Sequence, residues 1–221
     1  MDENQVKPKL LVVGDSFMTR DERYPGHHWS EMITEYTVIN LAQIGASNFI
    51  INYNLMQGLK HQPDAVVIGF TDPFRLEVSS KISLVKDTTV FSRVPSPWIT
   101  NLYHDYINDD CRKYINMTRH LQDDDLNGNK TALEVLGILS FLKQQQIKTV
   151  FSYGLFEGYL TQGFIQLRIL AELDKFKASK IEHNLVDYIT DINSTDIAFH
   201  VNDQKQQRKF AKEVVKRLSI C

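Results

Sequence analysis

Residues 9–16 read Lys9-Leu10-Leu11-Val12-Val13-Gly14-Asp15-Ser16. The apolar, partly β-branched part of this stretch stops abruptly at Gly-Asp-Ser, which is typical of a short buried strand that ends in a turn. Runs of the same kind recur at residues 37–41, 65–69 and 148–152. Because these runs are apolar throughout instead of alternating, they predict strands buried on both faces.

Amphipathic helical patterns separate these runs. They cover residues 29–35, 48–60, 131–145 and 203–218. Strands that alternate with helices predict an α/β fold, in which a parallel sheet is covered by helices on both sides. In such sheets ligands bind beyond the carboxyl ends of the strands, so we look for chemistry directly after each strand.

The bulk composition excludes several classes of protein. The chain has 221 residues, no composition break, and a formal charge of -2 from 25 basic and 27 acidic residues. We therefore expect a single domain over residues 1–221 and no nucleic-acid binding. Cys111 and Cys221 form neither a disulfide framework nor a metal motif. The polar start and the absence of a long apolar run predict a cytoplasmic protein with no membrane contact.

The segment from about 77 to 129 departs from the short-loop pattern. It contains prolines, tyrosines and the acidic patch Asp123-Asp124-Asp125, and a helical piece is expected at 108–120. We interpret the segment as an insertion over one end of the sheet. It either caps a crevice there or has no functional role.

Four segments at the predicted strand ends carry the candidate chemistry. They are Gly14-Asp15-Ser16, the loop at residues 40–48, Gly69-Phe70-Thr71-Asp72, and residues 195–203 before the last helix. Together, and in this order, they resemble the blocks of the GDSL/SGNH hydrolase family. The run at 69–77 is also similar to an SGNH-like subgroup of large bacteriophages and bacteria. The resemblance implies a three-layer flavodoxin-like fold with a parallel sheet of about five strands.

The first two segments supply the nucleophile and the oxyanion hole of this resemblance. It implies that Ser16 attacks the substrate and that the amides of Ser16 and Gly45 bind the oxyanion. A helix N-terminus beside Ser16 would favour the developing charge. The structural alternatives are that Asp15 and Ser16 cap a helix, and that Gly45 makes a turn before a helix capped by Ser47 or Asn48.

The third segment departs from the family. Thr71 stands where the family has an oxyanion asparagine. Either its hydroxyl is the third donor, Asn48 reaches in as a substrate-binding donor, or activity is weak. Arg75, four residues later, either forms a surface ion pair with Glu77 or faces an anionic group of the substrate.

The last segment contains the candidate base. His200 lies directly before the last helix, as the family requires, and would take the proton of Ser16. The family's acid stands three residues before this histidine, whereas Asp196 stands four before it. Either Asp196 orients His200 through a bulge, or Asp191, a carbonyl or water does so. His27 and His28 are interpreted as part of a loop that enters a helix, and we predict no metal site.

The resulting hypothesis is a serine esterase that forms an acyl-serine intermediate without a cofactor. Its substrate would be a small-molecule or carbohydrate ester, such as an O-acetylated sugar. The alternative is a catalytically degenerate SGNH-like module that binds a glycan or protein, in a bacteriophage particle or a host-cell cytoplasm. A flavodoxin-like nucleotide or flavin binder is a third interpretation.

Overall fold

The computed structural model describes residues 6–20, 25–73, 75, 77–79, 91–93, 113, 117, 123–161, 165–181 and 204–220. Within these ranges the main sheet consists of β1 (Lys9–Val13), β2 (Thr37–Asn40), β3 (Ala65–Gly69) and β6 (Lys148–Ser152). The longer helices are α1 (Asn48–Gly58), α3 (Asp124–Gln144), α5 (Leu167–Asp174) and α6 (Gln204–Leu218). Shorter helical pieces are η1 (Trp29–Glu31), η2 (Leu59–His61), η6 (Gly154–Phe156), α4 (Glu157–Thr161) and η7 (Lys177–Ser179).

The four strands are parallel and lie in the order β2-β1-β3-β6. This order agrees with the doubly wound flavodoxin-like arrangement, in which the first strand lies between the second and the third. The register places Leu10 of β1 opposite Val38 of β2 and Ala65 of β3. A single parallel bridge joins Phe151 to Lys180 beyond the other edge of β6. The α/β fold and all four predicted strand positions are confirmed, and of the roughly five strands expected, four lie within the described ranges.

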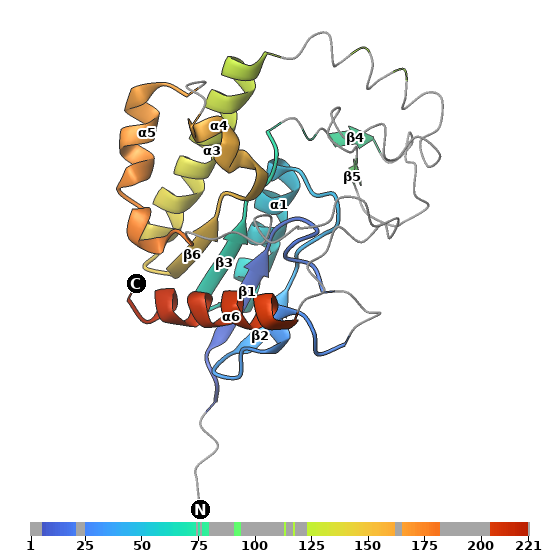
Figure 1. Ribbon diagram of the computed structural model, residues 1–221, viewed down its shortest axis with the longest axis vertical. Coiled ribbons are helices and arrows are strands. Elements are labelled where there is room, and N and C mark those ends of the chain that lie inside the picture. The colour runs from blue at the N-terminus through green and yellow to red at the C-terminus, as the bar shows by residue number, and fades with distance from the viewer. Residues whose placement is uncertain are drawn as a thin grey trace, which may run out of the picture.

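Alternate side chains of the strands belong to two different cores, one on each face of the sheet. Figure 1 shows α6 crossing in front of the strands. On one face, Leu11, Val66 and Phe151 pack with α1, α3 and α5. On the other face, Leu10 and Val67 pack with η1 and α6. Both faces of the central strands β1 and β3 are therefore buried, which is why their sequences are almost continuously apolar, whereas β2 is partly exposed.

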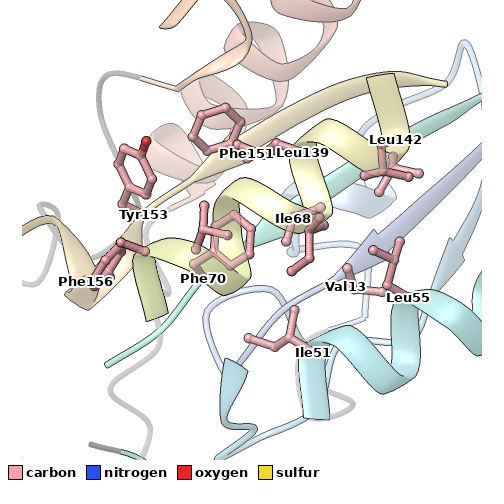
Figure 2. Packing of buried hydrophobic residues seen from close by; sticks show 14 of the residues in the cluster. Val13, Ile51, Leu55, Ile68, Phe70, Leu139, Leu142, Phe151, Tyr153 and Phe156 are labelled. Carbon is pink, nitrogen blue, oxygen red and sulfur yellow. The ribbon is translucent and has the colours of Figure 1, made fainter. Parts of the chain in front are cut away.

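The larger of the two cores lies between the sheet and helices α1 and α3. Figure 2 shows Ile51 and Leu55 of α1 on one side of Val13 and Ile68, with Leu139 and Leu142 of α3 close by. Towards the carboxyl ends of β3 and β6 the packing becomes aromatic. The rings of Phe70, Phe151, Tyr153 and Phe156 meet there edge to face. This end of the core supports the loops that carry the candidate site.

Helix α3 begins earlier than its apolar pattern predicts. Asp123 caps the helix by accepting a 2.8 Å hydrogen bond from the amide of Leu126, and Asp124 and Asp125 occupy the first turn. Carboxylates favour this position because the helix N-terminus carries a partial positive charge. The acidic patch therefore begins helix α3, which takes in the last residues of the expected insertion.

Parts of the expected insertion are described. Strands β4 (Glu77–Ser79) and β5 (Phe91–Arg93) pair antiparallel, and Figure 1 shows them apart from the main sheet. The helix expected at 108–120 lies outside the described residues, except for helical positions at Lys113 and Met117. Among the helices that the structure describes, none has the length and apolar character needed to cross a membrane.

Candidate functional site

The carboxyl ends of β1, β2 and β3 bring three loops together. The backbone amide of Gln43, in the loop after β2, donates to the carbonyl of Gly14 at the end of β1 with a length of 2.9 Å. After β3, the amide of Phe70 donates to the carbonyl of Ser152 at 2.9 Å and so extends the pairing with β6. The loops that contain Ser16, Gly45 and Thr71 therefore lie at one edge of the sheet.

Ser16 lies on a tight turn directly after β1 and is partly exposed. The turn closes through a 3.1 Å hydrogen bond from the amide of Met18 to the carbonyl of Asp15. The Asp15 carboxylate also accepts from the amide of Phe17 at 3.0 Å. The expected helix N-terminus beside Ser16 is wrong, because residues 15–19 form turns and bends. The side chain of Asp15 stabilises this turn in the way that Asp commonly does.

Gly45 lies in a turn that precedes α1. Its φ of 70° is in the left-handed region, which glycine adopts without a steric penalty. The amide of Ala46 donates to the carbonyl of Gln43 at 3.0 Å, and Ser47 caps α1 by accepting from the amide of Ile50 at 3.3 Å. The turn-and-cap interpretation of this loop is therefore confirmed. An oxyanion role for the Gly45 amide is compatible with it and stays a prediction.

Asn40, at the end of β2, ties this loop to the turn of Ser16. Its side-chain oxygen accepts from the amide of Ala42 at 2.9 Å, and its side-chain nitrogen donates to the carbonyl of Met18 at 2.9 Å. The sequence analysis assigned Asn40 no such role. The available signal was a polar carboxamide as the last residue of an otherwise apolar strand.

Thr71 and Asn48 are both buried and bind each other reciprocally. The side chain of Asn48 donates to the carbonyl of Thr71 at 2.9 Å and accepts from its amide at 3.0 Å. The hydroxyl of Thr71 donates to Oδ2 of Asp15 at 2.8 Å. The structure therefore brings both candidate donors to the site, and the hydrogen bonds described above go to other groups of the protein.

Arg75 lies in the loop after β3, and its side chain is 8% exposed. One terminal nitrogen lies 3.3 Å from Oδ2 of Asp15, and the other donates to the carbonyl of Ala46 at 3.1 Å. The carboxylate partner that the structure describes for Arg75 is therefore the buried Asp15, and a pair with Glu77 stays a prediction. The side chain of Glu77 lies outside the described part.

His200, Asp196 and Asp191 lie outside the described residues, so their relation to Ser16 stays a prediction. The helix that follows them is described. The side chain of Gln207 in α6 accepts from the backbone amide of Trp29 at 2.8 Å. Phe210 of α6 and Trp29 of η1 share a core with Met18, which belongs to the turn of Ser16. The first half of α6 therefore packs on the same face of the sheet as that turn.

His28 is a second histidine near the turn of Ser16. One ring nitrogen lies 2.8 Å from the hydroxyl of Ser30, and the other lies 3.5 Å from the carbonyl of Phe17. His28 caps η1 in a capping box with Glu31, which confirms that this histidine precedes a short helix. That helix ends at Glu31, earlier than the predicted end at residue 35.

Across the described ranges, no group of three or more His, Cys, Asp or Glu residues is arranged to hold a metal.

Comparisons with known proteins identify structural relatives. No family model and no curated protein matches the sequence. One matching solved structure is the psychrotrophic esterase EstA from Pseudoalteromonas sp., inhibited by monoethylphosphonate, with 11% identity and a TM-score of 0.53 over 97% of this chain and 98% of that chain. Another is the acetyl xylan esterase AlAXEase, with 13% identity and a TM-score of 0.47 over 94% of this chain and 98% of that one. The likeness to EstA extends over nearly the whole of both chains and shows that this protein has the same parallel α/β fold.

Proposed function

We propose that this protein is a serine esterase of the GDSL/SGNH type. The observation that carries the proposal is the position of Ser16. This partly exposed serine lies on the turn after β1, at the same sheet edge as Gly45, whose loop is hydrogen-bonded to the end of β1. A nucleophile on a turn after the first strand is the arrangement that the sequence resemblance implies, and EstA, an esterase, shares the fold.

The proposed reaction has two steps. In the first, the hydroxyl oxygen of Ser16 attacks the ester carbonyl while His200 takes its proton, and the alcohol leaves with that proton as the acyl-serine forms. In the second, water attacks the acyl-serine, His200 takes a proton from the water, and the acid leaves as Ser16 regains its proton. Asp196 orients His200. No cofactor takes part in these steps.

The proposed oxyanion hole consists of the backbone amides of Ser16 and Gly45. The resemblance would add Thr71 as a third donor. In the structure the Thr71 proton is directed at Asp15, so the hydroxyl reaches an oxyanion only after it leaves that carboxylate. Two amide donors suffice for substantial stabilisation, since each oxyanion donor is worth about 10²–10³ in rate.

The substrate that we propose is a small acyl ester, and more specifically an O-acetyl group on a carbohydrate. This choice rests on the resemblance alone. A panel of p-nitrophenyl esters of increasing acyl length, together with acetylated oligosaccharides, tests it. Activity that falls steeply beyond the acetyl ester is expected. A preference for long acyl chains would contradict the choice.

Ester hydrolysis is tested with two probes on the purified protein. Wild type is expected to hydrolyse p-nitrophenyl acetate and to be labelled on Ser16 by a fluorophosphonate, and Ser16→Ala is expected to do neither. Thr19→Ala is the matched control, because Thr19 lies on the same turn and its hydroxyl donates to the carbonyl of Asp15 at 2.9 Å. Wild type that is no more active or labelled than Ser16→Ala would refute the esterase proposal.

The second candidate is a degenerate binding module with the same fold. The specific observation in its favour is that the Thr71 hydroxyl, where the family has a free oxyanion donor, is buried and bound to Asp15. This candidate predicts binding of an acetylated glycan without turnover. Isothermal titration with acetylated oligosaccharides distinguishes it from the enzyme, because the enzyme would deacetylate the ligand during the experiment.

A further inference from the structure

We propose that Arg75 is a positioning residue that holds the nucleophile turn and the glycine loop in their mutual arrangement. This inference rests on the proposed function and adds to it a residue that the proposed reaction steps do not use. The inference is based on where the two hydrogen-bonding partners of Arg75 stand in the sequence. Asp15 directly precedes Ser16, and Ala46 directly follows Gly45. The side chain of Arg75 therefore contacts one sequence neighbour of each proposed oxyanion donor.

The geometry joins the two loops through one planar group. One terminal nitrogen of Arg75 lies 3.3 Å from Oδ2 of Asp15, and the other donates to the carbonyl of Ala46 at 3.1 Å. A guanidinium is planar and rigid, so the separation of its two nitrogens fixes the separation of the two acceptors. The two acceptors belong to Asp15 and Ala46, each the direct sequence neighbour of a residue whose amide is a proposed oxyanion donor.

Burial strengthens the contact between Arg75 and Asp15. The side chains of Arg75 and Asp15 are 8% and 4% exposed. The Asp15 carboxylate also accepts from the amide of Phe17 at 3.0 Å and from the hydroxyl of Thr71 at 2.8 Å. Its orientation is therefore set by donors from its own turn and from the loop after β3. Charged hydrogen bonds that are shielded from water are stronger and better defined than exposed ones.

The positive charge of Arg75 also affects the negative charge that develops on the substrate oxygen. A carboxylate in the residue before the nucleophile opposes the negative charge that develops on the substrate oxygen. The guanidinium at 3.3 Å offsets that field. Lysine would preserve the charge, but a single ammonium lacks the fork that reaches two acceptors in fixed geometry. Arg75→Lys and Arg75→Ala thus separate the effect of geometry from the effect of charge.

The experiment measures kcat and KM for p-nitrophenyl acetate and the rate of fluorophosphonate labelling. Arg75→Ala is expected to lower kcat by about 10²-fold, the usual effect of displacing one oxyanion donor, while KM changes little. Arg75→Lys is expected to lower kcat by about tenfold, because charge remains and geometry is lost. Methylguanidinium added to Arg75→Ala is expected to restore part of kcat, and to restore none in Ser16→Ala. Arg168→Ala, at an exposed position of α5, serves as the matched control with wild-type kinetics.

Each outcome has a defined meaning. If wild type is active and Arg75→Lys, which keeps the buried charge, matches it in kcat, the positioning role is refuted while the esterase proposal stands. If Arg75→Ala loses activity only in proportion to the unfolded fraction seen by circular dichroism, and methylguanidinium restores nothing, the role is likewise refuted. If wild type itself neither turns over substrate nor labels, both proposals fail together.

Discussion

The carboxylate of Asp15 and the hydroxyl of Thr71 are 56 residues apart in the sequence and are joined by a 2.8 Å hydrogen bond. This bond connects the turn of the candidate nucleophile to the loop where the family resemblance places a third oxyanion donor. A hydroxyl has one proton, so a hydroxyl that donates to Asp15 does not donate elsewhere at the same time. The bond therefore determines what a substitution at Thr71 does.

Thr71→Val removes the hydroxyl and keeps the shape of the side chain. We expect a loss of about 1–3 kcal/mol in the free energy of unfolding, because the buried Asp15 carboxylate loses a donor. Since the hydroxyl proton is directed at Asp15, kcat is expected to fall by less than about tenfold, below the usual effect of an oxyanion donor. Urea denaturation and steady-state kinetics measure the two quantities.

Thr71→Ser is the control, because it retains the hydroxyl and loses only a methyl group. It is expected to keep both activity and most of the stability. A fall of about 10²–10³ in kcat for Thr71→Val, with unchanged stability, would instead show that the hydroxyl turns from Asp15 to the oxyanion during the reaction.

Gly45→Ala tests the proposed oxyanion loop. Gly45 has a φ of 70°, where an alanine costs about 1–2 kcal/mol, and a new methyl group would stand beside the proposed oxyanion amide. We expect both the stability loss and a fall of about 10²-fold in kcat/KM. Gly26→Ala is the matched control. It has a φ of 78°, and among the described residues no atom lies within 4 Å of the new methyl, so it is expected to carry the same strain with no effect on activity. Equal activity of the two variants would contradict a role for the Gly45 amide.

His200→Ala and Asp196→Asn test the predicted proton-transfer pair. Loss of a general base costs about 10²–10⁴ in rate, so His200→Ala is expected to lower kcat by that factor. Asp196→Asn is expected to lower kcat by a comparable factor, because the imidazole loses the acid that fixes its tautomer. Asp191→Asn is the control and is expected to retain activity. If Asp191→Asn loses activity while Asp196→Asn retains it, Asp191 is the orienting acid.

The framework could be predicted from sequence because it depends on local patterns. The run Ala65–Gly69 is apolar throughout, and it forms a fully buried strand with the predicted bounds. Helix α3 was predicted to begin at Thr131 because its apolar periodicity begins there, whereas capping by Asp123 starts it at Asp124. Capping depends on one hydrogen bond, and the same acidic residues are equally common in loops.

The positions of the candidate site residues at the strand ends were predictable from sequence, and their contacts were not. Ser16, Gly45 and Thr71 were located correctly at the carboxyl ends of strands, since parallel topology alone brings those ends together. The pairing of Arg75 with Asp15 was not predicted, because it depends on how two loops fold back in three dimensions. Glu77 is only two residues from Arg75 in the sequence. The acid that Arg75 contacts in the structure is Asp15, which is 60 residues from it in the sequence.

The buried hydroxyl of Tyr153 is expected to make the fold less stable at alkaline pH. Burial raises the pKa of its hydroxyl above the ordinary value of 10.0, and the charges of Glu157 and Asp174 raise it further. Above pH 10 the unfolded chain therefore loses this proton while the folded protein keeps it, so the free energy of unfolding falls as pH rises. Below pH 10 both states hold the proton and the effect vanishes.

Tyr153→Phe removes this titration and keeps the ring, which packs edge to face against Phe151 and Phe156. We expect the stability of wild type to decline more steeply than that of Tyr153→Phe between neutral pH and pH values above 10, measured by urea denaturation at each pH. Tyr53→Phe is the control, because it makes the same substitution at a tyrosine that is 40% exposed on α1. Identical pH profiles for wild type and Tyr153→Phe would show that the buried hydroxyl does not govern the alkaline decline.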